Sequence, residues 1–264
     1  MYKALFFDID GTLVPFGHTE PQPEVLAALE AVQRRGVKVF IATGRQMSWI
    51  TNLGTLRPDG YVTVNGNVVL EADGRTMIFC NTIDAGDMDR LTDYAARPDA
   101  LPLMAVPPTG QIVQSRPEGP LVKRVRQYID FPYVPVTDFS TLRGCPIAQL
   151  MVFGTEEERR RSGIFDSVLT HCDPTSWNPY FCDVIPRGCD KAVGIDRMIE
   201  RHGIALSETM AFGDGGNDIA MLAHAGMGVA MGNAANEVKR SAGYVTDEVS
   251  RDGVVAALKH FGLL

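Results

Sequence analysis

The sequence contains no long hydrophobic run. Its apolar stretches are short, such as Ala4–Phe7 and Met210–Phe212, whereas a membrane-spanning helix needs roughly 20 consecutive apolar residues. Near the start, Lys3 is followed at once by a strand-like stretch and then by Asp8 and Asp10, so the apolar segment of a signal peptide is missing as well. We therefore expect neither a membrane span nor a signal peptide.

Positive charge is also in short supply. Lys and Arg together number 25, against 32 Asp and Glu, which gives a formal net charge of −7. Proteins that bind nucleic acid normally carry a basic surplus or a basic patch. We therefore expect no nucleic-acid partner.

Cysteine is scarce and has no metal-binding spacing. The chain has five cysteines, an odd number, and no C-x-x-C motif. This pattern argues against a disulfide framework and against a zinc site, and it fits a reducing compartment. We therefore predict a cytoplasmic protein.

Both ends of the chain alternate strand and helix patterns. Tyr2–Asp8 and Val37–Ala42 are apolar and of strand length, and Pro21–Arg35 between them has apolar residues at helical spacing. The same order returns late in the chain, with a predicted helix at Lys191–His202 and a predicted strand at Thr209–Phe212. Such a β-α-β order predicts a parallel sheet covered by helices.

The middle of the chain differs in composition and in the order of its predicted elements. It holds many of the prolines, short strand-like pieces and predicted helices at Glu118–Ile129 and Glu156–Thr170, without regular β-α-β alternation. With 264 residues, the chain has room for one or two domains. We therefore predict an α/β protein with a Rossmann-like parallel-sheet core made from residues 1–83 and 186–264, and an α+β domain inserted at residues 84–185.

Polar residues follow three of the predicted core strands. They form the segments Asp8–Thr12, Thr43–Arg45 and Gly213–Asp218. Ligands of open parallel sheets bind beyond the carboxyl ends of the strands, so we expect these segments to meet at one site. Its four carboxylates would repel one another unless a cation lay among them. Oxygen ligands alone favour Mg²⁺ over zinc or copper.

Competing motifs fail on spacing. Asp8–Gly11 resembles the start of an EF-hand loop, but Leu13 and Thr19 stand where that loop needs Gly and Glu. The sequence has no P-loop, no complete three-glycine dinucleotide fingerprint and no G-x-S-x-G of a serine hydrolase.

Taken in order, the motifs resemble the haloacid dehalogenase superfamily, and within it the Cof-type phosphatases with a large inserted cap of class IIB. The matching segments are Asp8–Thr12, Thr43–Arg45, Lys191, Gly213–Leu222, Met231–Ala234 and Asp252–Val254. The resemblance implies a phosphomonoester hydrolase whose inserted cap closes over the site and selects the leaving group. It suggests small phosphorylated metabolites, such as sugar phosphates or phosphorylated cofactors. The inserted segment matches nothing specific, which leaves the substrate open, and the oligomeric state is open as well.

The resemblance also implies roles for the catalytic residues. Asp8 would be the nucleophile that becomes an aspartyl-phosphate. Asp10 would protonate the leaving group and then activate water. Lys191, which the sequence alone does not distinguish from a solvated lysine, would neutralise the phosphoryl group and the nucleophile.

Further residues would bind phosphate or metal. Thr43 and the N–H groups near Gly44 would hold phosphoryl oxygens, at a strand expected to lead into a helix N-terminus. Arg45 would contact the substrate, unless it is an exposed helix arginine. Asn217 would orient Lys191 or a phosphoryl oxygen. The assigned metal ligands are Asp8, Asp10, Asp214 and Asp218.

Some assignments have simpler alternatives. Thr12 is equally well explained by a structural bond across its loop. Asn65-Gly66 is most simply a hairpin turn, and Asn233 most simply caps the following helix. Two other functions stay open: a phosphomutase with the same core residues, and a non-enzymatic module that keeps a stable aspartyl-phosphate. A base at Asp10 argues against the second.

Overall fold

The computed structural model describes residues 1–51, 53–129 and 131–264. The chain forms two compact units. The core unit consists of Met1–Phe79 and Asp190–Leu264, and the inserted unit consists of Cys80–Cys189. Among the described residues, no helix combines the length and the apolar character that crossing a membrane would require.

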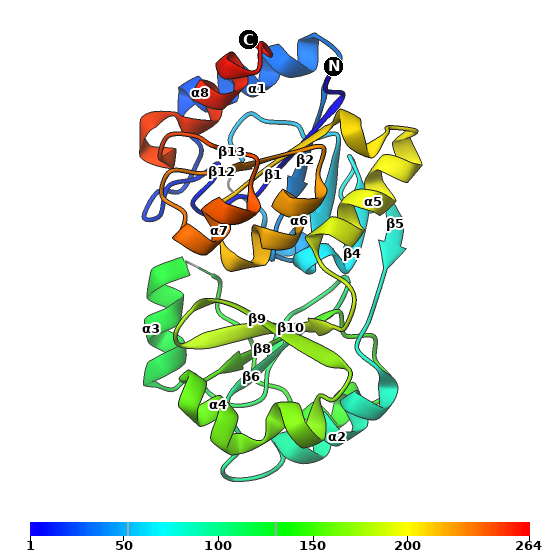
Figure 1. Ribbon diagram of the computed structural model, residues 1–264. Helices are drawn as coiled ribbons and strands as arrows, with labels where there is room; N and C mark the ends of the chain where they lie inside the picture. The colour runs from blue at the N-terminus through cyan, green and yellow to red at the C-terminus, as the bar shows by residue number, and fades with distance from the viewer. Residues whose placement is uncertain (52, 130) are drawn as a thin grey trace. The chain divides into compact units, whose positions relative to one another are not determined.

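The core unit is built on an eight-stranded sheet with the order β13-β12-β11-β1-β2-β3-β4-β5 (Figure 1). The first six strands in this order are parallel, and β4 pairs antiparallel with β3. The strand bounds are β1 Ala4–Phe7, β2 Lys38–Ala42, β3 Gly60–Thr63, β4 Val68–Glu71, β5 Met77–Cys80, β11 Thr209–Gly213, β12 Met227–Ala230 and β13 Tyr244–Val245. The predicted α/β class with a parallel core sheet is confirmed.

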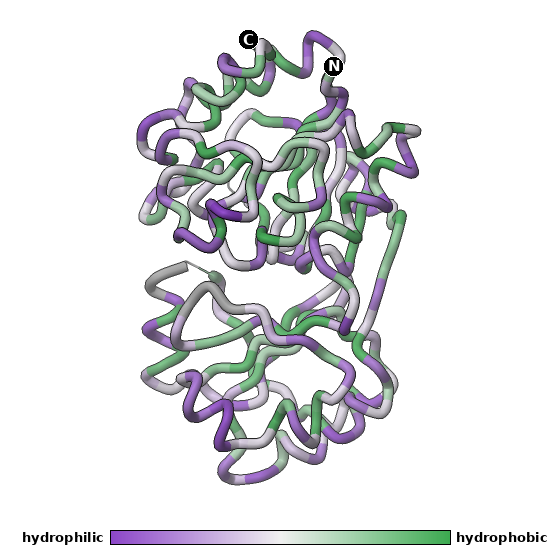
Figure 2. The backbone as a smooth tube through the Cα atoms, viewed as in Figure 1, coloured by the Kyte–Doolittle hydropathy of each residue, from purple (hydrophilic) through white to green (hydrophobic). Residues whose placement is uncertain are grey.

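Helices cover both faces of this sheet because the central strands are apolar on both sides. All four residues of β1 are fully buried. One face packs against residues of α5, α6 and α7 in a single hydrophobic cluster, while α1 packs against β2 and α8. The alternation of apolar and polar residues along the helices appears as green and purple stretches in Figure 2. The helix bounds are α1 Pro23–Arg34, α5 Lys191–His202, α6 Ile219–His224, α7 Asn236–Ser241 and α8 Gly253–His260.

Several core connections are single helical turns. They are η1 Met47–Trp49, η2 Val64–Gly66, η5 Leu206–Glu208, η6 Gly216–Asp218 and η7 Val249–Arg251. The helix expected directly after β2 is therefore wrong, because only the short turn η1 follows there. The backbone between β2 and η1 bonds to the turn η2 and not along a helix. The carbonyl of Arg45 accepts from the N–H of Val64, and the carbonyl of Thr43 accepts from the N–H of Asn65.

The inserted unit is an antiparallel five-stranded sheet with helices. Its strand order is β7-β6-β8-β10-β9, and its hydrophobic cluster joins the sheet to α2 and to the turns η3 and η4. The bounds are α2 Ala85–Ala95, β6 Leu103–Val106, β7 Val113–Gln114, α3 Pro120–Ile129, η3 Phe139–Leu142, β8 Gln149–Phe153, α4 Glu156–Ser162, η4 Ile164–Val168, β9 Cys172–Asn178 and β10 Phe181–Pro186.

One predicted helix of the inserted unit is shorter than expected. The helix predicted over Glu156–Thr170 ends as α4 at Ser162, because Gly163 adopts a left-handed conformation with φ of 62°. A glycine in this conformation is a common helix terminator. The π-helical turn η4 follows it.

Candidate active site

The polar segments follow neighbouring strands. In the sheet β1 lies between β11 and β2, with Phe7 paired to Phe212 on one side and to Ile41 on the other. The ends of the three strands are therefore level. Asp8 follows β1 directly, Thr43 follows β2, and Asp214 follows β11.

Lys191 is held between two carboxylates. Its Nζ atom lies 2.7 Å from Oδ1 of Asp8 and 2.6 Å from Oδ1 of Asp218, and its side chain is fully buried. Burial acts to lower the pKa of Lys191, but Asp218 and Asp8 outweigh it and raise the pKa above its usual value. Lys191 is therefore charged at every physiological pH.

The position of Lys191 is set by the start of α5. The side chain of Asp190 accepts hydrogen bonds from the N–H groups of Ala192 and Val193, which makes Asp190 the N-cap of this helix. Gly66 packs against this point, since a Cβ atom there would lie 1.9 Å from the carbonyl oxygen of Asp190. The lysine is thus fixed at the first helical residue.

Asp8 is a buried carboxylate with one cationic partner. Burial raises its pKa well above the usual value, and Lys191 counteracts this effect only in part. The neighbouring carboxylates raise the pKa further. More carboxylates therefore gather around Asp8 than Lys191 alone neutralises.

Asp218 organises the loop after β11. Its Oδ1 atom accepts from Lys191, and its Oδ2 atom accepts from the N–H groups of Asp214 and Gly215, both at 2.9 Å. Gly213 permits this approach, because a Cβ atom there would lie 2.5 Å from Asp218. Asp218 thus holds both Lys191 and the Gly-rich loop.

Asp214 joins this loop to the loop after β1. Its carboxylate accepts from the Thr12 hydroxyl at 3.2 Å and from the Asn233 amide at 3.1 Å. The Thr12 hydroxyl therefore has a structural bond, which runs to the loop after β11 and not across its own loop as expected. Gly11 has φ of 83°, and a Cβ atom there would lie 2.2 Å from Asp214 Oδ2. Burial and the charge of Asp218 raise the pKa of Asp214 to about 7.

These carboxylates fit a divalent cation. One oxygen from each of Asp8, Asp214 and Asp218 lies within 4.8 Å of the others. Burial first, and neighbouring carboxylates after it, raise the pKa values of Asp8 and Asp214, and a cation among these groups would favour their charged forms. The donor set consists of hard oxygens, which suits Mg²⁺ better than zinc or copper.

Asp10 is turned toward a different partner. Its Oδ2 atom accepts from Arg45 Nε at 2.8 Å and its Oδ1 atom from Arg45 Nη2 at 2.7 Å. Arg45 is therefore paired with a carboxylate and does not follow a helix surface. The exposed helix position expected for it is therefore wrong, and the substrate contact stays a prediction.

The residues expected to bind phosphate lie around the turn η2. Thr43 is buried, with 1% of its surface exposed, and its Oγ1 atom accepts from the N–H of Arg45. A Cβ atom on Gly44 would lie 3.1 Å from the Asn65 amide oxygen. Asn217 donates to that oxygen at 2.9 Å. Asn217 thus contacts Asn65, while Asp218 takes the expected role of orienting Lys191.

Two asparagines contribute more than the sequence suggested. Asn65 is 1% exposed, and both Val64 and Asn65 have left-handed backbones with φ near 53°, which is costly for a β-branched residue such as valine. Such strain in a turn is often found at functional sites. Asn233 does not cap α7, whose N-cap is Ala235; it donates to the Gly11 carbonyl and to Asp214. The only sequence signal for either was its place in a motif.

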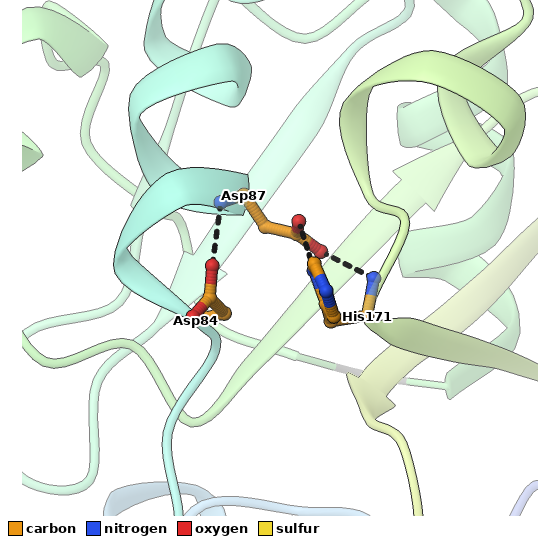
Figure 3. Close-up of side chains that lie close together, drawn as sticks. All are labelled: Asp84, Asp87 and His171. Carbon is orange, nitrogen blue, oxygen red and sulfur yellow. Dashed lines mark hydrogen bonds and ion pairs between the residues drawn. The ribbon is translucent and has the colours of Figure 1, made fainter.

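A second group of metal-type side chains lies in the inserted unit. Asp84, Asp87 and His171 come together there (Figure 3). Asp87 already accepts from the His171 N–H at 2.8 Å and from His171 Nδ1 at 3.0 Å, and it is paired with the guanidinium of Arg90. Asp84 caps α2. Because these donors converge on Asp87, the group ties α2 to the start of β9 and does not fit a metal ion.

The sequence and fold match one known family over nearly their full length. A family profile described as haloacid dehalogenase-like hydrolase matches residues 5–258. The chain therefore belongs to this family, and the resemblance inferred from the motifs is confirmed.

Individual relatives define the class within this family more closely. "Putative phosphatase YkrA" of Bacillus subtilis strain 168 is 34% identical over 264 residues, which cover 99% of this chain and 98% of that protein. "HMP-PP phosphatase" of Serratia proteamaculans strain 568 is 30% identical over 249 residues, or 90% of this chain and 87% of that protein. The solved structure of the HAD subclass IIB sugar phosphatase BT4131 matches with a TM-score of 0.89 and 37% identity, covering 99% of this chain and 100% of that chain. The predicted enzyme class, a phosphatase of this superfamily, is confirmed.

Proposed function

We propose that this phosphatase is a Mg²⁺-dependent phosphomonoester hydrolase that acts on small phosphorylated metabolites through an aspartyl-phosphate at Asp8. The observation that carries the proposal is the buried contact between the Asp8 carboxylate and the Lys191 ammonium group at 2.7 Å. A carboxylate at a strand end, held by a fixed cation, suits a nucleophile that must approach a negatively charged phosphoryl group.

In the first step, an oxygen of Asp8 forms a bond to phosphorus while the bond from phosphorus to the leaving oxygen breaks. Asp10 gives its proton to that oxygen, so the product leaves as an alcohol. Lys191 balances charge on the phosphoryl oxygens, and Thr43 with the N–H groups near Gly44 donates hydrogen bonds to them.

In the second step, water attacks the phosphorus of the aspartyl-phosphate. Asp10, now a carboxylate, takes a proton from this water. The bond from phosphorus to Asp8 breaks, which releases inorganic phosphate and restores the free Asp8. The same side chain thus acts first as acid and then as base.

The metal would be held by Asp8, Asp214 and Asp218, the three carboxylates whose oxygens come together. When bound, Mg²⁺ supplies positive charge that offsets the repulsion between the Asp8 carboxylate and the phosphoryl group. It would also offset the mutual repulsion of the carboxylates, which adds to burial in raising their pKa values.

We assign substrate selection to the inserted unit, residues 80–189. All the proposed catalytic residues belong to the core unit, so the reaction itself needs no residue of the inserted unit. The names of the relatives, a sugar phosphatase and an HMP-PP phosphatase, support small phosphorylated compounds as the substrate class.

The test is a rapid-quench experiment on Asp10→Asn with labelled 4-nitrophenyl phosphate. The aryl oxide leaves without a proton, so we expect a burst of product near one equivalent, with the label retained on Asp8. Hydrolysis of that intermediate should slow by about 10²–10⁴-fold, the usual loss for a general base.

Wild-type activity should vanish in excess chelator and return with Mg²⁺ but hardly with Ca²⁺, whose longer and looser coordination disturbs in-line attack. Full turnover in chelator would refute the metal requirement, and Asp8→Asn that still turns over would refute the nucleophile.

A further inference from the structure

We propose that Arg45 is a positioning residue for Asp10: its guanidinium holds the Asp10 carboxylate in the orientation needed for proton transfer to and from the reacting oxygens. The inference rests on the proposed function, because it needs Asp10 as the acid and base. It differs from the role expected from the sequence, in which Arg45 contacts the substrate itself.

The contact between the two side chains is a two-point fork. Nε and Nη2 of Arg45 each donate to a different oxygen of Asp10, at 2.8 and 2.7 Å. Paired parallel bonds of this kind fix the plane of a carboxylate as well as its position. Each carboxylate oxygen has two lone pairs, so the fork leaves one lone pair on each oxygen of Asp10 for a proton.

The guanidinium of Arg45 has a further hydrogen-bond partner besides Asp10. Its third nitrogen, Nη1, donates to the carbonyl oxygen of Trp49 at 3.0 Å. Three of the five N–H groups of Arg45 are therefore taken, two by Asp10 and one by the Trp49 carbonyl. The geometry therefore favours a role through Asp10.

The backbone of Arg45 is anchored on both sides. Its N–H donates to Thr43 Oγ1 at 3.2 Å, and its carbonyl accepts from the N–H of Val64 at 3.1 Å. Val64 is one of the residues with a left-handed backbone. The turn η2 thereby fixes the backbone from which the Arg45 side chain extends.

Asp10 needs such support because its own surroundings hold it weakly. Its side chain is 29% exposed, against 19% for Arg45, and it precedes Gly11, whose φ is 83°. A half-buried carboxylate beside a glycine turn has several rotamers available. The fork selects one of them, and small errors in the placement of a proton donor can slow a reaction strongly.

The two possible roles of Arg45 predict different dependence on the leaving group. Phosphate is common to all substrates, so loss of a phosphate contact would slow every substrate equally and weaken inhibition by inorganic phosphate. Loss of Asp10 orientation would slow the first step only where the leaving oxygen needs a proton. Phenyl phosphate has a poor leaving group and 2,4-dinitrophenyl phosphate a good one, which makes them the two probes.

For Arg45→Met we expect kcat/KM for phenyl phosphate to fall by at least about tenfold, toward the 10²–10⁴-fold typical of a lost general acid. The value for 2,4-dinitrophenyl phosphate should change less than about threefold, and the inhibition constant of inorganic phosphate should stay the same. Arg45→Lys keeps the charge but cannot form a fork, so it should show the same split between substrates with a smaller loss. In Arg45→Met/Asp10→Asn the loss on phenyl phosphate should equal that of Asp10→Asn alone, because both act on one proton transfer.

The matched control is Arg57→Met. Arg57 lies on the same connection but donates to the carbonyls of Gly54, Thr55 and Leu56, so its variant should keep wild-type values with both probes. Equal losses on both probes, together with weaker phosphate inhibition in the Arg45 variants, would overturn the positioning role and make Arg45 a phosphate ligand. Additive losses in the double variant would also overturn it. A wild-type protein that hydrolyses neither probe would overturn the proposed function, and the inference with it.

Discussion

The Lys191 ammonium group lies 2.7 Å from Oδ1 of Asp8, although 183 positions separate the two residues in the sequence. Both side chains belong to the core unit, one at the end of β1 and the other at the start of α5. Asp218 completes the arrangement on the far side of the lysine at 2.6 Å. A single cation thus offsets two buried carboxylates.

Replacing this cation should destabilise the protein and abolish activity. Lys191→Met leaves Asp8 and Asp218 buried without a positive partner, and removal of one side of a buried ion pair typically costs about 3–5 kcal/mol. Urea unfolding in chelator would measure this loss. Lys259→Met, at an exposed position in the last turn of α8, should change the unfolding free energy very little. Equal stability of the two variants would contradict the buried triad.

The metal-free protein should become less stable as the pH rises through the neutral range. Asp214 has a pKa of about 7 in the folded chain, against 3.8 in the reference state, so between these values the folded state binds more protons than the unfolded state. The stabilisation from this proton is complete below about pH 4 and is lost as the pH passes 7; the difference is at most about 4 kcal/mol. Asp8 acts in the same direction.

Urea unfolding between pH 5 and 8 in chelator would measure that slope. Asp214→Asn should flatten it, because the amide does not titrate, whereas Asp166→Asn at an exposed position of the inserted unit should leave it unchanged. Added Mg²⁺ should stabilise the protein most at the high-pH end, where the carboxylates are ionised. A slope of the opposite sign would contradict the assignment.

Asn65 should matter for phosphate binding more than for folding. Asn65→Gly keeps the left-handed backbone available but removes the amide that contacts Asn217 and Gly44. This part-buried bond orients Asn217, one of the proposed phosphate-binding residues, so its loss, up to about 1.4 kcal/mol, corresponds to up to about tenfold in binding. We therefore expect the inhibition constant of inorganic phosphate to rise by about that factor.

The control for Asn65 is its neighbour Asn67, which is also buried. Asn67 donates to the Val64 carbonyl and braces the same turn. Asn67→Ala should lower the urea midpoint while the folded enzyme keeps its inhibition constant for phosphate. If both variants weaken phosphate inhibition equally, the effect belongs to the turn as a whole and not to the Asn65 amide.

Asp87 should stabilise the inserted unit without affecting the chemistry. Burial acts to raise its pKa, but hydrogen bonds from residues 170–172, above all from His171, hold the pKa below its usual value. Asp87→Ala removes the buried carboxylate that accepts from the His171 backbone N–H and ring in Figure 3, and a hydrogen bond to a charged group contributes about 1.5–3 kcal/mol. We expect a loss of about that size or larger in thermal unfolding of the inserted unit.

Asp89→Ala is the matched control for Asp87, since Asp89 lies on the same helix with a side chain 59% exposed. It should shift the unfolding temperature little. Kinetics on 2,4-dinitrophenyl phosphate should be unchanged in both variants below their unfolding temperatures. Stabilisation of the wild type by zinc at this group would contradict the structural role.

The sequence predicts the parallel core well because its signals are local. Apolar strands such as β1 end in acidic residues, and parallel strands place their carboxyl ends on one edge. No local pattern marks Lys191, since its proposed role depends on burial between Asp8 and Asp218, of which Asp8 is far away in the chain. The pairing of Arg45 with Asp10 and the contact of Asn65 with Asn217 depend on how loops meet in space, which neither spacing nor polarity encodes.

The errors in secondary structure have physical causes as well. After β2, hydrogen bonds to the turn η2 replace those of a helix, and at Gly163 a left-handed residue ends α4. The sequence does not indicate the hairpin of β9 and β10, because β9 begins with a mixed segment that contains Pro174 and lies at the edge of its sheet. Edge strands tolerate such residues and show little alternation.

The place of β1 between β2 and β11 has a consequence for synthesis on the ribosome. The partner β2 emerges soon after β1, but β11 follows only after the whole inserted unit has been translated. At about 5–20 residues per second, the roughly 200 intervening residues leave one edge of an entirely apolar strand unpaired for some 10–40 s. An open strand edge is a template for aggregation, so the length of the insertion sets how long a nascent chain needs protection by chaperones. Over the same interval Asp8 has neither Lys191 nor Asp214 beside it, so the proposed active site is complete only once the last quarter of the chain is made.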